Sequence, residues 1–373
     1  MSEFQTKEMV EGISRWVGCE SPTLQPEAVN RMIDLVASEF DGVPVRLERV
    51  PGTKGLADVL IVHAGPDNGE PHCVVLSHID TVHPLGTIEK DLPIRIEGDK
   101  LFGPGVMDMK GGAYMGMAAF RSAVKAGALK RPTVYMFTPD EEVGSISTRH
   151  LIEERSRGAA HVLVTEPVRP GKRVVTARRG SGRFDVYLRG IPAHSGSGQD
   201  IGRSAIREAA HQILALEAQN SEELGVSATV GLIKGGTAAN TIPEHAWFKV
   251  DFRMTRPEDA TRLDSFIRNL QPHDPEVQIR VEGVITRPPY QKTQPIAELH
   301  ERIKVIGVEY GLDLEELPLA LGGSDANFTA AMGIPTMDGL GIEGFGGHTL
   351  EEHALISSIT PRTEFFRDLL VRL

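Results

Sequence analysis

Three consecutive carboxylates follow a short apolar segment near the middle of the chain. Asp140, Glu141 and Glu142 come directly after Thr133–Phe137, whose β-branched and aromatic residues predict a buried strand. A proline and a glycine break the chain around them, so the carboxylates should lie in a loop at the carboxyl end of that strand. Neighbouring side chains of an extended segment point in opposite directions, so Glu141 and Glu142 could face a metal ion and a reacting water. On its own, such a triplet is more typical of a solvated acidic loop.

Other residues of types that commonly bind metals occupy comparable positions along the chain. Four of the candidates follow a predicted strand, and the fifth, Asp108, precedes a predicted helix. In open α/β sheets, binding sites form beyond the carboxyl ends of the strands. Each residue alone has a structural explanation, as a buried histidine, a helix cap, a turn residue or a loop residue. Together they favour one site composed of His78, Asp108, Glu142, Glu166 and His348.

Imidazoles and carboxylates without a cluster of thiolates suit zinc, manganese or cobalt ions. Five protein ligands are too many for one open tetrahedral zinc ion. They fit two ions that share one carboxylate and hold a water between them. Asp80 stands two residues after His78 and could orient its imidazole.

The elements that would position these residues are strands alternating with helices, which predicts an α/β layer with a mostly parallel sheet. From about residue 178 the order becomes strand-helix-strand-strand-helix-strand, the outline of a ferredoxin-like α+β insert. From Thr293 the α/β pattern returns. We therefore expect a discontinuous catalytic domain of residues 1–177 and 288–373, with an inserted domain of residues 178–287. The strands of the first part are predicted at Val45–Val50, Asp58–His63, His72–Leu76, Thr133–Phe137 and His161–Val164.

Composition places limits on partners and location. A length of 373 residues favours two domains. A net charge of -11 without a run of basic residues argues against nucleic-acid binding. Cys19 and Cys73 do not form a disulfide framework, and we expect both to be reduced. The first residues lack an apolar signal core and no apolar run approaches ~18 residues, so we expect a cytoplasmic protein without membrane contact.

Several motifs resemble those of the M20 metallopeptidase family, which includes glutamate carboxypeptidase (carboxypeptidase G), aminoacylase, acetylornithine deacetylase and succinyl-diaminopimelate desuccinylase. The first three are SHIDT at Ser77–Thr81, GPGVMDMKGG at Gly103–Gly112 and TPDEEVG at Thr138–Gly144. The resemblance covers nearly the whole chain, since later motifs match in order: Thr165–Pro167, Ala193–Gly196, Gly235–Asn240, Asp251–Arg253 and Gly346–His348.

The resemblance implies a role for each candidate ligand. Asp108 would bridge two zinc ions, for which cobalt or manganese could substitute. Glu142 and His348 would complete one ion's site, and His78 and Glu166 the other's. The peptide bond after Asp108 is a candidate for the cis conformation that this family often has.

Catalytic roles are implied in the same way. Glu141 would be the general base, taking a proton from the water and passing it to the leaving nitrogen. Asp80 would be the partner of His78. The insert would act as a lid and form a homodimer by edge-to-edge strand pairing. Across that dimer His194, with Asn240 nearby, would stabilise the oxyanion.

Substrate contacts are predicted from charge and from the same resemblance. Arg253 and Arg287 could each hold a substrate carboxylate in bidentate fashion, although a strand-end arginine is equally typical of a surface ion pair. Gly323 and Ser324 belong to a segment that resembles the family's substrate-side glycine loop; otherwise it is a turn and helix cap.

Two details concern the branch of the family. Glutamate at position 166, where aminopeptidases of the family tend to have aspartate, favours a carboxypeptidase or a deacylase. The segment Gly344–His348 looks closest to the glutamate carboxypeptidase branch, although Gly347 stands where that pattern has tyrosine. The sequence thus predicts hydrolysis of an amide bond to a carboxylate-bearing amino acid. An N-acyl-amino-acid deacylase is the alternative. A non-catalytic binding protein is disfavoured because Glu141 and all five ligands are present.

Overall fold

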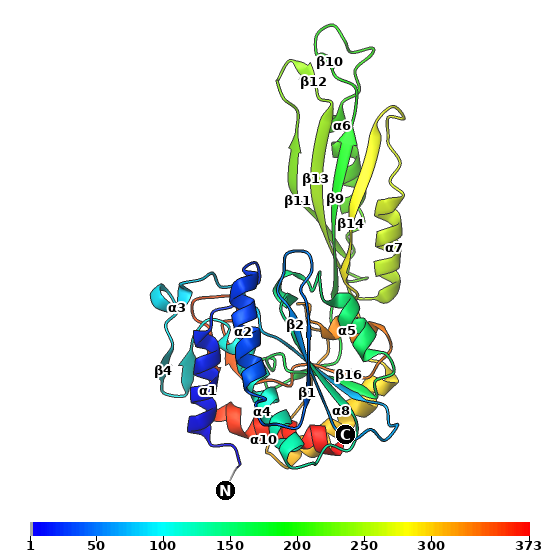
Figure 1. Cartoon of the computed structure of the whole chain (residues 1–373). Helices are drawn as coiled ribbons and strands as arrows, with labels where there is room; N and C mark the ends of the chain where they lie inside the picture. The colour runs from blue at the N-terminus through cyan, green and yellow to red at the C-terminus, as the bar shows by residue number, and fades with distance from the viewer. Residues whose placement is uncertain (1–2) are drawn as a thin grey trace. The chain divides into compact units, whose positions relative to one another are not determined.

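The computed structural model describes residues 3–373, whose contacts divide them into two units (Figure 1). The second unit consists of Arg178–Gln291 and Leu321–Gly323, and the first contains the remaining described residues. The chain returns to the first unit at Lys292 rather than at the expected residue 288. The reason is that Tyr290 still pairs with Arg178 through two backbone hydrogen bonds of 3.1 and 3.2 Å.

A six-stranded sheet is the centre of the first unit, and it is mainly parallel as the sequence predicted. β6, β3, β7 and β16 run parallel, whereas β2 is antiparallel to β6 and β1 is antiparallel to β2. Every residue of β3 is buried, which explains its unbroken apolar run. In spatial order the strands are β1 (Arg46–Val50), β2 (Val59–Ala64), β6 (Thr133–Thr138), β3 (Cys73–His78), β7 (His161–Val164) and β16 (Thr336–Met337).

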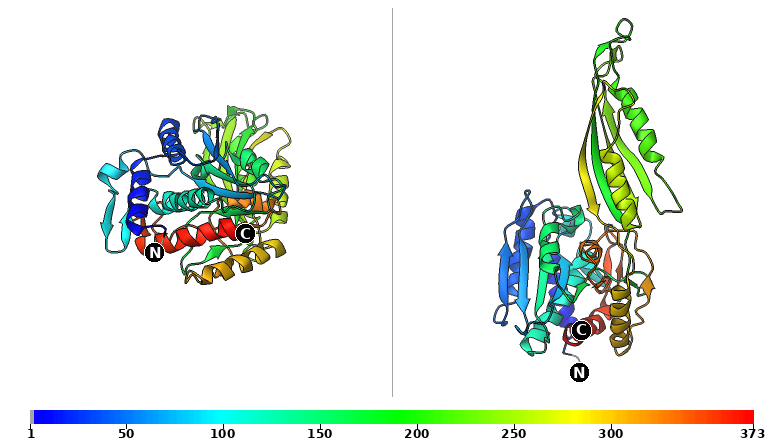
Figure 2. Two further views of the ribbon diagram at one scale, coloured as in Figure 1. Left: turned by 60° about the horizontal axis from the view of Figure 1, so that its bottom comes forward. Right: turned by 90° about the vertical axis from the view of Figure 1, so that its right-hand side faces the viewer.

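Helices pack around this sheet, and small residues let α4 (Gly111–Lys125) approach it closely. A Cβ atom on Gly116 would lie 2.4 Å from the Tyr135 hydroxyl, and one on Gly112 would lie 2.1 Å from the Thr165 carbonyl oxygen. α10 packs against α4, α1 and α8 (Figure 2). The remaining helices of this unit are α1 (Thr6–Gly18), α2 (Pro26–Ser38), α3 (Thr87–Lys90), α5 (Arg149–Ser156), α8 (Gln294–Val308), α9 (Ala326–Ala331) and α10 (Ile356–Arg372).

Two small sheets of the first unit were not expected from the sequence. One has the order β17-β18-β5-β4 and is built from Gly344–Phe345, His353–Leu355, Lys100–Phe102 and Arg95–Glu97. The other pairs β8 (Val174–Val175) with β15 (Glu316–Leu317). Strands of two or three residues are too short to show a period. In the first of these sheets, β18 lies between β17, which precedes His348, and β5, which leads to Asp108.

The second unit is a four-stranded antiparallel sheet of order β11-β13-β9-β14 with two helices on one face (Figure 1). Alternate residues of β13, from Ala246 to Met254, are buried against α6 and α7, and the residues between them point the other way. A short pair, β10 (Ala193–His194) with β12 (Thr241–Ile242), completes it. The main elements are β9 (Gly180–Arg189), α6 (Ala205–Glu217), β11 (Ser227–Gly235), β13 (His245–Met254), α7 (Pro257–Arg268) and β14 (Gln278–Arg287).

No helix within residues 3–373 is long and apolar enough to cross a membrane. Both cysteines are free thiols, as expected.

Candidate metal centre

All five predicted ligands lie in the first unit, and three of them are placed by the parallel sheet. His78 is the last residue of β3, Glu142 lies in the turn Glu141–Val143 after β6, and Glu166 follows β7. Because β6, β3 and β7 are adjacent and parallel, their carboxyl ends meet at one edge of the sheet. Asp108 lies in an irregular turn, Val106–Lys110, before α4, and His348 follows β17.

The Asp108 carboxylate lies between the two histidines. Its Oδ1 is 3.2 Å from Nε2 of His78, and its Oδ2 is 3.5 Å from Nε2 of His348. Glu142 Oε2 approaches the same atom of His348 at 3.1 Å, and Glu166 Oε1 is 3.7 Å from Nε2 of His78. One carboxylate therefore joins two imidazole–carboxylate groups.

Tighter groupings also include the expected base. Among the described residues, His78, Asp108 and Glu142 have ligand atoms within 4.8 Å of one another, and so do His78, Glu141 and Glu166. Glu141 thus lies in the cluster itself.

Glu142 shows that the cluster suits a cation. Its Oε1 is buried and has no hydrogen-bond partner among the described residues. A buried carboxylate oxygen in that state is unfavourable unless a positive charge is supplied. Burial also raises the pKa of Glu142 above its ordinary value. A divalent ion would satisfy the oxygen and favour the charged form.

Neighbouring carboxylates raise the pKa of both histidines. Hydrogen bonds to Asp108 and Glu142 raise the pKa of His348 to about 10. Burial would lower the pKa of His78, but hydrogen bonds to Asp108 and Asp80 outweigh it and raise that pKa well above its ordinary value. A metal ligand must be a neutral imidazole, so ions at this site would replace these protons.

Asp80 connects the two sides of the centre. Its fully buried carboxylate accepts hydrogen bonds from the backbone N–H groups of Glu141 and Glu142, both at 3.2 Å. Its Oδ1 also lies 3.4 Å from Nδ1 of His78. The Thr23 hydroxyl donates to Asp80 Oδ2 at 2.7 Å, a contact that the sequence analysis missed. Asp80 therefore positions the turn that carries the acids as well as the His78 ring.

Glu352 is a second residue that the sequence analysis missed. It is 1% exposed, and its carboxylate accepts backbone hydrogen bonds from Gly105, Met107 and Asp108 at 2.9 to 3.0 Å. His83 Nε2 lies 2.8 Å from the same carboxylate. Glu352 thus anchors the loop that presents Asp108, whose peptide bond to Met109 is cis, as predicted. Its spacing from the ligands carries no motif, so only the three-dimensional structure reveals it.

The predicted substrate-binding residues are divided between the units. Ser324, in the first unit, is fully buried; its hydroxyl donates to Asp338 at 2.9 Å and accepts from the Ala326 N–H at 3.0 Å. Gly323 lies against Arg287 in the second unit, where a Cβ would be 2.9 Å from the arginine Cδ. Ser324 therefore acts as a structural residue of its loop here.

The lid residues expected to contact substrate all belong to the second unit. His194 is exposed on β10, and its neighbour Ser195 donates a backbone hydrogen bond to the Asn240 carbonyl at 3.0 Å. Arg253 already has a carboxylate partner, because its Nε and Nη2 lie 2.6 and 3.2 Å from the two oxygens of Asp251. Arg287 is buried at the end of β14.

Such a cluster at the carboxyl edge of a parallel sheet defines an α/β metallohydrolase. Residues 74–372 match the model of peptidase family M20/M25/M40, and the chain belongs to that family. It is 26% identical over 370 residues to carboxypeptidase G2 of Pseudomonas sp. (strain RS-16), covering 97% of this chain and 88% of the relative. It is also 26% identical to succinyl-diaminopimelate desuccinylase of Delftia acidovorans, covering 94% and 95% of the two chains.

Solved structures share the fold. Aminopeptidase PepT from Bacillus cereus superposes with a TM-score of 0.77 at 21% identity, covering 99% of each chain. The YXEP protein of Bacillus subtilis, described as a dinuclear metal binding peptidase of the M20 family, gives 0.67 at 15% identity over 98% and 97% of the chains. The protein is an M20-type metallohydrolase.

Proposed function

We propose that the centre binds two divalent ions, with zinc as the native metal, and that Asp108 bridges them. Glu142 and His348 would hold one ion, and His78 and Glu166 the other. The observation that supports this pairing is the Asp108 carboxylate, whose two oxygens are directed at the two different histidines. The imidazole–carboxylate donor set suits zinc, and cobalt or manganese could substitute.

When bound, the ions would supply a more acidic water and polarise the scissile carbonyl. Glu141 would be the general base, because it lies in the same cluster and its backbone is fixed by Asp80. It would accept the water's proton and donate it to the leaving nitrogen. Asp80 would hold the His78 imidazole in the orientation that presents Nε2 to the site.

The proposed reaction is hydrolysis of an amide bond to a carboxylate-bearing amino acid, with C-terminal glutamate or a similar residue released. Carboxypeptidase G2 is a relative over nearly the whole chain, and Glu166 is consistent with that branch. A substrate carboxylate would bind Arg253 in place of Asp251, or bind Arg287. The second candidate is an N-acyl-amino-acid deacylase, which the similarity to the desuccinylase favours.

The proposed homodimer would form through β11, one of the two edge strands of the second unit. Its Leu232 and Ile233 are 56% and 55% exposed, and Leu214 on α6 is 70% exposed. The opposite edge, β14, carries the charged residues Arg280, Glu282 and Arg287, and charges on an edge strand discourage edge pairing. We further propose that His194 of one subunit serves the site of the other and that the protein works in the cytoplasm, where its free thiols would persist.

The test is a release assay on a panel of N-acyl and peptidyl conjugates with zinc-, cobalt- and manganese-loaded enzyme beside a chelated control. We expect metal-dependent release concentrated in glutamate or aspartate conjugates. Release from N-acyl amino acids alone would identify the protein as a deacylase. Absence of release from every conjugate by enzyme with two ions bound would contradict the proposed reaction.

A further inference from the structure

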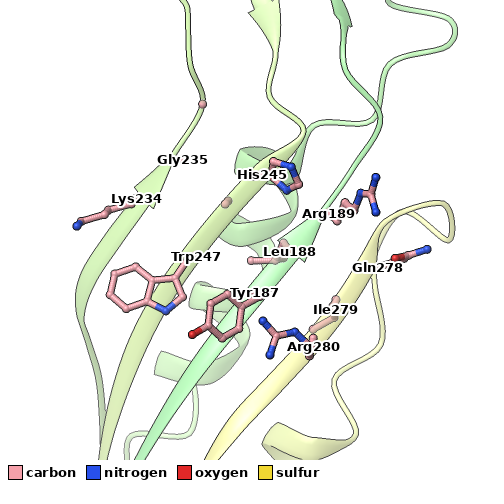
Figure 3. Close-up of a pocket in the computed structure, with 12 residues that line it drawn as sticks. Tyr187, Leu188, Arg189, Lys234, Gly235, His245, Trp247, Gln278, Ile279 and Arg280 are labelled. Carbon is pink, nitrogen blue, oxygen red and sulfur yellow. The ribbon is translucent and has the colours of Figure 1, made fainter.

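The open face of the lid sheet carries a row of side chains that the proposed reaction does not use. The row crosses all four strands, and its members pair directly: Lys234 opposite Trp247, Trp247 opposite Tyr187, and Tyr187 opposite Arg280. Figure 3 shows the two rings side by side with a cationic side chain on either side. This face is opposite the one that packs on α6 and α7.

These residues line a concave pocket of about 630 Å³. That volume is within the range of about 300–1,000 Å³ typical of small-molecule sites. Arg189, His245 and Gln278 add polar groups at one end (Figure 3). The pocket therefore has the size of a ligand site and lies entirely within the second unit.

The two rings are held in fixed positions. Trp247 Nε1 donates a hydrogen bond of 2.9 Å to Asp185, which also pairs with Lys249 at 3.4 Å. The Arg280 guanidinium lies 4.0 Å from the centre of the Tyr187 ring, and the Lys234 ammonium 6.0 Å from the centre of the Trp247 ring. Both are cation–π geometries, which place one positive charge beside each ring.

The charge of the pocket differs from that of the chain. Its lining includes Lys234, Arg280, Arg189 and His245 but no carboxylate, although the whole protein has a net charge of -11. Three of these groups have acidic neighbours outside the lining, since Arg280 pairs with Glu282, and Arg189 and His245 both lie near Glu244. Lys234 forms no ion pair within the described part of the chain.

We infer that this pocket binds a small planar aromatic molecule that carries an anionic group. The ring would stack on Trp247 and Tyr187, and the anion would be paired by Lys234 and Arg280. An aromatic carboxylate and a nucleotide share this chemistry. A polynucleotide does not fit, because the positive charge is confined to one pocket of an acidic protein. The inference does not depend on the metal centre.

The test is isothermal titration of the full-length, metal-loaded protein with 2-naphthoate and with adenosine monophosphate. Cyclohexanecarboxylate, which lacks the aromatic ring, is the control for 2-naphthoate. Adenosine, which lacks the negative charge, is the control for adenosine monophosphate. We expect saturable binding of at least one charged aromatic probe and binding at least about tenfold weaker for the matching control probe. Binding should be unchanged after chelation, which distinguishes this pocket from a substrate site at the metals.

Substitutions of the lining residues test whether the probes bind in this pocket. Trp247→Leu should weaken binding by about tenfold or more, and Lys234→Gln or Arg280→Gln by about threefold to tenfold. Arg183→Gln, which removes an exposed charge from the same face outside the pocket, should bind as wild type. Circular dichroism and the melting temperature establish that each variant is folded.

The proposal is overturned if neither charged aromatic probe binds, or if Trp247→Leu binds both unchanged. Absence of binding together with a weaker dimer in Trp247→Leu would identify the face as a contact between two copies of the chain.

Discussion

The metal centre and the exposed side chains of the lid solve opposite physical problems. Asp80 and Glu352 are almost fully buried, and their carboxylates receive hydrogen bonds from backbone N–H groups. His194 and Arg253 are exposed or partly exposed on strands. Burying a carboxylate is unfavourable without such donors, so the metal centre must be preorganised by its surroundings. The lid side chains stay hydrated and can exchange one interaction partner for another.

This difference separates the residues that one chain brings together by itself from the residues that need a partner molecule. The five candidate ligands and Glu141 lie together within the first unit. In the proposed function, His194 and Arg253 of the lid would act only against substrate or a second subunit. Substitutions of the five candidate ligands should therefore act through metal content, and substitutions in the lid should leave metal content unchanged.

The largest effect is expected for Asp108→Asn. Loss of the charge shared by both histidines should remove both ions, and turnover should fall at least about 10³-fold, since the water would no longer be activated. Metal content by mass spectrometry and a release assay measure the two effects. Asp91→Asn, an exposed aspartate, is the matched control. Two tightly bound ions in Asp108→Asn would exclude the bridging role.

His194→Ala tests the lid side of the comparison. Turnover should fall by about 10²- to 10³-fold, as for other oxyanion contacts, with metal content unchanged. If His194 acts across the dimer, mixing this variant with Glu141→Gln should restore activity, because half of the sites in mixed dimers are then intact. Random mixing predicts about a quarter of wild-type activity. Mixtures as inactive as the separate variants would place His194 with its own subunit's site, and full activity of His194→Ala alone would place His194 outside catalysis.

Glu352→Gln should loosen the loop that presents Asp108. The glutamine side chain has an NH2 donor in place of one of the two oxygens that accept the three backbone hydrogen bonds. Metal affinity should therefore fall by about 10- to 100-fold. Glu351→Gln, on the exposed adjacent residue, should bind metal as wild type. Titration with a competing chelator measures the affinity, and melting of the metal-free proteins separates it from stability. An unchanged metal affinity in Glu352→Gln would show that Glu352 contributes to the fold and not to metal binding.

The smallest effect concerns His161, a buried residue at the start of β7. Burial lowers its pKa from 6.5 to about 3, so the unfolded chain takes up a proton between these values and the folded chain does not. Stability should therefore fall as pH drops below 6.5, by about 2 kcal/mol at pH 5 from this residue alone. Denaturant unfolding of His161→Phe should lack this component, and the exposed His150→Gln should retain it. Equal pH dependence in all three would contradict the assignment.

The strand-end part of the candidate centre could be grouped from the sequence, for a physical reason. A parallel sheet brings the carboxyl ends of β6, β3 and β7 to one edge, so His78, Glu142 and Glu166 could be grouped from strand positions alone. The ferredoxin-like order of the insert was equally readable, because long strands such as β13 alternate clearly.

The remaining features depend on contacts that no local pattern encodes. Glu352 reaches the Asp108 loop from more than two hundred residues away, and β17, β18, β5 and β4 are too short to show a period. Arg253 was expected to be available to substrate, but the register places Asp251 on the same face as its partner. Long-range pairing of this kind appears only once the chain is folded.

The central claim is that adjacent carboxylates, Glu141 and Glu142, have different roles. The most direct test measures bound metal and turnover on the same samples of Glu141→Gln and Glu142→Gln. We predict that Glu141→Gln keeps two ions per chain and loses turnover by about 10²- to 10⁴-fold, whereas Glu142→Gln loses an ion. Equal loss of metal in both variants, or near-normal turnover by Glu141→Gln, would contradict the account.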